Sequence, residues 1–167
     1  MGRNILGAEI LTRFDGIVLD TFYVADARTG LLANREERDK FENLVQKIVT
    51  EAPLDLPALI AKVRHAPATY KSLDGERIPA VVELDNAISD TRTIVDLQAE
   101  DRVGLLYDVS RALAELNVNV YLAKILTEKG AAIDTFYIAE RNGSKVLDPE
   151  RQKVIKQRLR QAVQIGP

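Results

Sequence analysis

The chain has 167 residues, a formal net charge of −2, 29% charged residues and 46% hydrophobic residues. This balance is typical of a folded globular protein that has enough chain for one domain or two small ones. Basic and acidic residues are mixed along the chain. The sequence therefore lacks the basic footprint that binding to a nucleic acid backbone requires, and we expect no nucleic acid partner.

The composition also limits metal and redox chemistry. The chain has no cysteine, which excludes disulfides and thiolate metal sites, and it has one histidine, His65. A histidine metal site needs further ligands, so we interpret His65 as a surface residue and predict neither a metal site nor a cofactor.

No apolar run approaches the ~20 residues of a membrane span, and the start of the chain is not typical of a signal peptide. We expect a soluble, cytoplasmic protein without a membrane partner.

The first predicted element is a β-hairpin over residues 4–26. Two runs rich in Ile, Val, Leu, Tyr and Phe flank a glycine-containing turn at residues 14–16, a pattern typical of a hairpin. Apolar residues are expected on both faces of its first strand, with Leu6, Ala8 and Ile10 on one side and Ile5 and Leu11 on the other.

A helix and a linker are predicted next. The helix is indicated by apolar residues at helical spacing, namely Phe41, Leu44, Val45, Ile48 and Val49. Residues 53–77 contain three prolines and a Ser-Leu-Asp-Gly stretch, which is typical of a linker. Apolar residues between Leu56 and Val63 predict a short amphipathic helix inside it.

The second half of the chain predicts six elements. Strands are indicated at residues 78–84 and 93–99, followed by a turn at 100–104 and a helix that ends at Leu116. The inward face of that helix is expected to consist of Leu105, Leu106, Val109, Ala112, Leu113 and Leu116. A second hairpin spans residues 119–140, and a last helix is expected after the N-cap residue Asp148.

The two predicted hairpins are copies of one sequence. When Asn4 is aligned with Asn119, residues 10–12 fall on 125–127 with identical letters. After one residue is dropped at the turn, residues 20–23 fall on 134–137, again with identical letters. We therefore interpret Asp20 and Asp134 as residues with equivalent structural roles and not as a catalytic pair.

The order of elements predicts an α+β fold. The second unit matches a ferredoxin-like βαββαβ arrangement, an antiparallel sheet with helices on one face, and its extra leading strand is expected at the edge that such a unit normally fills with its last strand. We predict a partial first domain at residues 1–52, a linker at 53–77 and an essentially complete second domain at 78–167. The first domain lacks a leading strand and helix, so we expect this chain to come from a longer protein.

Residues 100–125, "EDRVGLLYDVSRALAELNVNVYLAKI", resemble the ACT domain, a small-molecule-sensing module of amino-acid metabolism. The repeat and residues 134–137, "DTFY", make the chain similar to the tandem ACT regions at the C-terminus of bacterial PII uridylyltransferase/uridylyl-removing enzymes. The resemblance implies a regulatory region that binds an amino acid, glutamine, and thereby controls the uridylylation and deuridylylation of the nitrogen-regulatory PII protein. The partners that it implies are the catalytic domains of a parent enzyme.

The resemblance also implies a ligand site at the turn before the helix. The implied residues are Asp101, Arg102, Val103, Gly104, Leu105 and Leu106, joined by Asn119 at the start of the next strand. A helix N-terminus offers unpaired N–H groups to a carboxylate, and Asp101 is suited to accept from an ammonium group. The family's turn usually reads Asp-Arg-Pro-Gly, so Val103 is expected to leave the turn looser. The alternative is that Asp101 is an N-cap, Gly104 a turn residue and Asn119 a loop end.

Other functions are less well matched. We find no catalytic residues: the sequence has no match to the metal-binding carboxylates of a nucleotidyltransferase or to the His-Asp signature of a hydrolase. An RNA-binding module would need aromatic residues within a basic groove. The remaining alternatives are a ligand-free ACT-like dimerisation module and a regulatory domain of another protein of amino-acid metabolism.

We also expect the chain to form a homodimer with residues 4–26 at the interface. A lone hairpin is marginally stable, and its open edge invites another strand. The second unit of the same chain is the alternative source of that cover.

Overall fold

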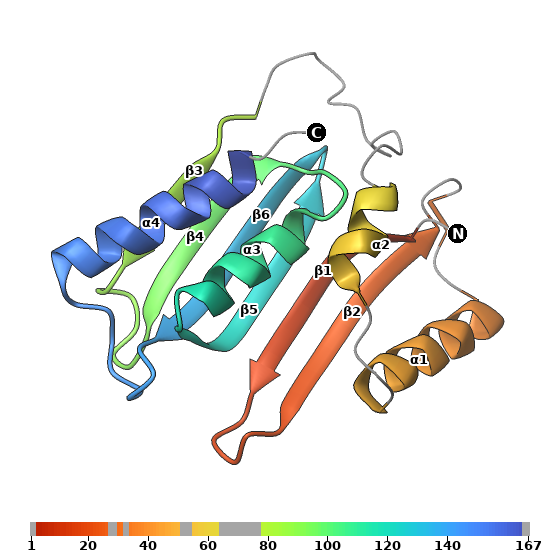
Figure 1. Ribbon diagram of the computed structural model, residues 1–167, viewed down its shortest axis with the longest axis horizontal. Coiled ribbons are helices and arrows are strands. Elements are labelled where there is room, and N and C mark those ends of the chain that lie inside the picture. Colours follow the sequence, from red (N-terminus) through yellow and green to blue (C-terminus); the bar gives the residue numbers. More distant parts are fainter. Residues whose placement is uncertain (1–2, 27–29, 32–33, 51–54, 64–77, 165–167) are drawn as a thin grey trace.

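The computed structural model describes residues 3–26, 30–31, 34–50, 55–63 and 78–164. In this part of the chain six strands form one antiparallel sheet in the order β2-β1-β5-β6-β4-β3. Figure 1 shows the helices α3 and α4 across one face of that sheet. None of the helices described is long and apolar enough to cross a membrane. His65 lies outside the described residues.

The first hairpin is confirmed, with β1 at Arg3–Thr12 and β2 at Val18–Asp26. The chain reverses at Gly16, whose φ of +84° lies in the left-handed region that glycine adopts without strain. The predicted faces of β1 were partly wrong. An irregularity in the pairing between Ile5 and Gly7 shifts the alternation, so that Ile5, Ala8 and Ile10 share the face that packs on the core.

The helices that follow have N-terminal caps set by their sequences. α1 (Arg35–Thr50) begins with reciprocal bonds in which the side chain of Asn34 accepts from the N–H of Glu37 at 3.0 Å and the Glu37 carboxylate accepts from the N–H of Asn34 at 3.0 Å. α2 (Leu56–Val63) has Asp55 as its cap. α1 meets the sheet where the ring of Phe41 lies edge-on to that of Phe22, with ring centroids 6.4 Å apart.

The second unit has the predicted ferredoxin-like arrangement. Its elements are β3 (Val81–Asp85), β4 (Thr93–Glu100), α3 (Leu105–Glu115), β5 (Asn119–Glu128), β6 (Ala131–Ala139) and α4 (Pro149–Gln164). Within this unit the strand order is β5-β6-β4-β3. The leading strand β3 therefore occupies the edge position predicted for it.

The core lies between this sheet and the inward faces of α3 and α4. Val95, Leu97, Phe136 and Ile138 point from the central strands toward the helices, and Val109, Ala112, Ile155 and Leu159 point toward the sheet. These helix residues follow the 3.6-residue period of an amphipathic helix. The predicted inward face of α3 is confirmed, except that Leu106 is only partly buried.

The two units join edge to edge within one chain. β1 pairs antiparallel with β5, with Gly7 opposite Leu126 and Leu11 opposite Leu122. These two strands are equivalent members of the repeat, so the second unit supplies one neighbour for the hairpin. β2 is left as the outer strand of the sheet described here.

A buried polar cluster fastens the β3–β4 loop to the loop before α4. Thr93, which is fully buried, donates its hydroxyl to the side-chain oxygen of Asn86 at 2.7 Å and accepts the N–H of Val146 at 2.8 Å. The Nδ2 of Asn86 donates to the Val146 carbonyl, and the Lys145 ammonium donates to the carbonyls of Asn86 and Ser89. This cluster satisfies backbone groups that the loops would otherwise bury without partners.

Candidate functional site

The predicted ligand turn links β4 to α3 at one end of the sheet. Its backbone is anchored where the N–H of Asp101 donates to the carbonyl of Gly130 in the β5–β6 turn, at 2.8 Å. Gly104 precedes the first helical residue with a φ of +82°. A residue with a β-carbon is disfavoured in that conformation, so glycine is required here by the backbone itself.

The start of α3 is open to an acceptor from outside the helix. Its N-cap residue is Gly104, which has no side chain to cap the first-turn amides, and no side-chain hydrogen bond caps the helix. The amide of Leu105 donates to the carbonyl of Arg102. An uncapped helix start presents N–H groups and the positive end of the helix dipole, which suit a carboxylate.

Arg102 is held inside the protein between the first turn of α3 and the end of α4. Its guanidinium forms an ion pair with Asp108, at 2.8 Å, and donates to the carbonyl of Ala162 near the end of α4, at 2.8 Å. Asp108 is 2% exposed. The side chain of Arg102 therefore ties the turn to both helices, and its contribution to the site is to position the turn.

Asp101 in the turn and Asp134 on β6 interact electrostatically. The pKa of Asp134 is raised to about 7, mainly by burial; a hydrogen bond from the N–H of Leu126 lowers it, and the charge of Asp101 adds a smaller rise. Burial also raises the pKa of Asp101. Asp134 sits on the helix-facing side of β6, where its neighbours along the strand on that side are the core residues Ala132 and Phe136.

Asp134 and its repeat equivalent Asp20 lie in different surroundings. Asp134 is 2% exposed, whereas Asp20 is exposed. Our prediction of equivalent roles is therefore wrong for their burial, because the described first unit has no counterpart of the β4–α3 turn over β2. We had not included Asp134 in the site. The sequence feature that could have identified it is a single acidic residue among the inward-facing residues of a buried strand.

Asn119 lies at the other end of the sheet. It pairs with Ala139, whereas Glu100, beside the turn, pairs with Ala131. These positions are separated by eight residues of β6, roughly 26 Å at ~3.3 Å per residue. One small ligand at the turn does not reach Asn119 of the same unit. Since β1 runs antiparallel to β5, the N-terminal end of β1 lies beside the turn's end of the sheet.

Comparison with known proteins agrees with this architecture. Residues 81–166 match the family model described as an ACR9-like, ACT-like domain. The chain belongs to the ACT-like domain family. The matched residues extend from β3 to the end of α4 and include the β4–α3 turn. The resemblance inferred from residues 100–125 is confirmed.

Three relatives of this ACT-like chain are bifunctional uridylyltransferase/uridylyl-removing enzymes. The chain is 30% identical over 166 residues to the enzyme of Gluconobacter oxydans, 34% identical over 164 residues to that of Azospirillum brasilense and 31% identical over 166 residues to that of Ruegeria pomeroyi. The alignments cover 97–99% of this chain but only 17–18% of these relatives. No solved structure matches the chain.

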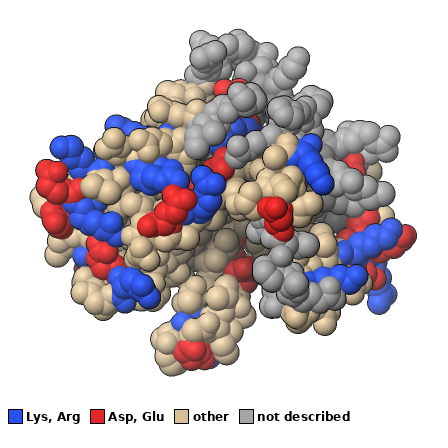
Figure 2. All heavy atoms as spheres, viewed as in Figure 1, with Lys and Arg blue, Asp and Glu red and all other residues tan. Residues whose placement is uncertain are grey.

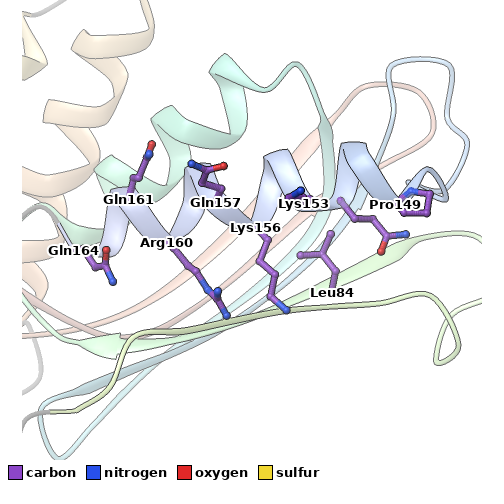
Figure 3. Close-up of a pocket in the computed structure, with 9 residues that line it drawn as sticks. Leu84, Pro149, Lys153, Lys156, Gln157, Arg160, Gln161 and Gln164 are labelled. Atoms are coloured by element: carbon purple, nitrogen blue, oxygen red, sulfur yellow. The ribbon is translucent and has the colours of Figure 1, made fainter.

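A separate groove runs along the outer side of α4 in the ACT-like unit. It has a volume of about 550 Å³, and Figure 3 shows Lys153, Lys156 and Arg160 of α4 beside it, with Leu84 of β3. It contains no residue of the predicted turn. Lys156 and Arg160 pair with Glu83, and Figure 2 shows basic and acidic side chains intermixed on this side of the molecule. One carboxylate thus serves two of the three cations, and the described residues that line the groove include no acidic one. The groove is basic, but it lies outside the turn to which the family resemblance points, so we favour the turn as the ligand site.

Proposed function

We propose that this chain is a regulatory ACT region that binds an amino acid, glutamine, at the β4–α3 turn. Through that binding it controls the uridylylation and deuridylylation of the PII protein by the catalytic domains of a parent enzyme. The family match and the names of the relatives support a regulatory region of this type. The choice of glutamine rests on the resemblance to the uridylyltransferase ACT regions.

One observation at the turn carries the proposal. The uncapped start of α3 belongs to the same turn as Asp101, whose carboxyl group interacts electrostatically with that of Asp134. An amino acid carries its carboxylate and its ammonium group on the same α-carbon, so it needs a site for an anion next to a site for a cation. The helix start suits the carboxylate, and the acidic pair suits the ammonium. The amide of the glutamine side chain would then distinguish it from other amino acids.

Isothermal titration calorimetry tests the proposal. We expect glutamine to bind the folded chain and Gly104→Val to abolish binding, because a branched side chain would occupy the approach to the α3 amides and strain the left-handed backbone. Gly16→Val is the matched control, since Gly16 has a nearly identical φ of +84° in the hairpin turn, with no neighbouring atom within 4 Å of an added β-carbon. It should keep glutamine binding.

The alternative function is a ligand-free ACT-like module. Val103 favours it, because the family's turn usually has proline at this position. Absence of heat with glutamine and with every other amino acid, in a sample shown to be folded by circular dichroism, would reject ligand binding and favour the module. Binding that persists in Gly104→Val would place the ligand elsewhere.

A further inference from the structure

The helix-free face of the sheet has an ordered pattern of polar and apolar rows. A central polar row crosses the strands from Thr21 on β2 through Glu9, Lys124, Thr135 and Asp96 to Glu83 on β3. Apolar rows flank it on both sides. One contains Leu19, Leu11, Leu122 and Tyr137, and the other contains Tyr23, Leu126 and Ile133.

These apolar side chains are open to solvent in the single chain. Tyr23 is 56% exposed, Leu19 52%, Leu126 46%, and Leu11 and Ile133 43% each. They are large residues gathered on the four adjacent strands β2, β1, β5 and β6. Exposed apolar residues gathered on one face in this way, in two rows on either side of a charged row, favour a binding interface.

We propose that this face binds the same face of a second copy of the chain, related by a two-fold axis that runs along the strands between β1 and β5. This rotation places β1 over β5 of the partner subunit and β2 over its β6. Two antiparallel sheets packed in this way bury their facing rows at a separation of ~10 Å. The proposal is independent of the ligand site.

The charges of the central row favour this axis. It places Glu9 over Lys124 of the partner subunit, and Lys124 over Glu9 of the partner subunit. Leu11 then faces Leu122 of the partner subunit, so that apolar rows meet apolar rows. An axis along the polar row would instead stack Glu9 on its own copy and Lys124 on its own copy, which is repulsive. The acidic residues Asp96 and Glu83 lie on β4 and β3, outside the four overlapping strands, where they stay in water.

The overlapping area is sufficient for a dimer of modest affinity. Four strands ~4.8 Å apart and 9–10 residues long give roughly 600 Å² of flat sheet on each side. Two such faces bury about 1,200 Å², the lower end of the range for specific interfaces. We therefore expect a reversible dimer whose population rises with protein concentration.

The decisive experiment uses two opposite charge variants measured by light scattering across a concentration series. Glu9→Lys and Lys124→Glu should each be monomeric, because each places like charges across the interface, with dissociation constants raised by about two orders of magnitude. An equimolar mixture should regain the dimer mass, since lysines of one variant then face glutamates of the other. Within its own chain each variant still has like charges at positions 9 and 124 after mixing. Recovery of the dimer on mixing therefore reports the contact between the two chains and not a repair within one chain.

A second pair of variants separates loss of the interface from loss of the fold. Leu126→Lys should abolish the dimer, while Val154→Lys, at a side chain on α4 that is 50% exposed, should leave it intact. Circular dichroism checks folding of all four variants. A wild-type chain that stays monomeric at every concentration would overturn the proposal. A dimer whose mass is unchanged by Glu9→Lys and Leu126→Lys would also overturn it, because the copies would then meet elsewhere.

Discussion

Replacing the buried Asp134 with asparagine should change how stability depends on pH. The carboxyl has a pKa of about 7 in the folded chain and an ordinary value of 3.8. The folded state therefore binds more protons than the unfolded state between these two values. Stability is lost as the pH rises through this window, and the loss is complete above about pH 7.

The magnitude follows from the difference between the two pKa values. At ~1.4 kcal/mol for each pH unit, the ionised carboxylate costs the folded state roughly 4 kcal/mol above pH 7. Asparagine carries no charge, and its side-chain oxygen keeps the bond from the N–H of Leu126. We expect Asp134→Asn to be about 2–4 kcal/mol more stable than the wild type at pH 8, because the cost of burying the new amide group offsets part of the gain. At pH 4 that cost remains without the gain, so the variant should be up to about 2 kcal/mol less stable than the wild type.

Urea unfolding followed by circular dichroism at pH 4.5, 6 and 8 measures this difference. The matched control is Asp20→Asn, which changes the repeat-equivalent but exposed residue and should follow the wild-type pH profile. If the free energies of unfolding of the wild type and Asp134→Asn run parallel across this pH range, Asp134 is not the buried titrating group, and the reasoning fails.

Two further changes test the packing around the turn and the loops. Arg102→Met should lower the free energy of unfolding, measured in urea, by about 3 kcal/mol, because the buried Asp108 loses this ion pair. The control Arg111→Met removes an exposed arginine and should cost less than about 1 kcal/mol. Equal losses in the two variants would contradict this prediction. Thr93→Val keeps the shape of the side chain but leaves the N–H of Val146 without its acceptor, so thermal and urea unfolding should show a loss of about 1–3 kcal/mol. An unchanged midpoint would show that this cluster does not contribute to stability.

Local patterns predicted the elements well because their causes are local. The hairpin turn at Gly16, the period of α3 and the N-terminal cap of α4 at Asp148 each depend on residues close in sequence. The position of β3 at the sheet edge was also predictable, since a βαββαβ unit normally fills that edge with its last strand. The β1 faces were the exception, because an irregularity at residues 5–7 depends on pairing with β2 and is not visible in alternation alone.

The site was predicted only in part, for a different physical reason. The turn at residues 101–106 is one continuous segment, so both the position of its glycine and its place before α3 could be predicted from the sequence. Asn119 is close to the turn in sequence. However, β4 and β5 run parallel and are joined by α3, so the start of β5, where Asn119 lies, is far from the end of β4, where the turn begins. Asp134 is distant in sequence but lies close enough to Asp101 to interact electrostatically, because β6 pairs directly with β4 and places Asp134 opposite Leu97.

The sequence by itself therefore determined the repeat, the α+β class and the resemblance to ACT regions, because these follow from the order of residue types along the chain. Tertiary structure alone decided that β1 pairs with β5, that Asp134 is buried while Asp20 is exposed, and that two apolar rows flank one charged row on the helix-free face. The period of a strand determines which residues share a face. Which strand lies alongside, and which loop covers its end, depends on contacts between segments far apart in the chain.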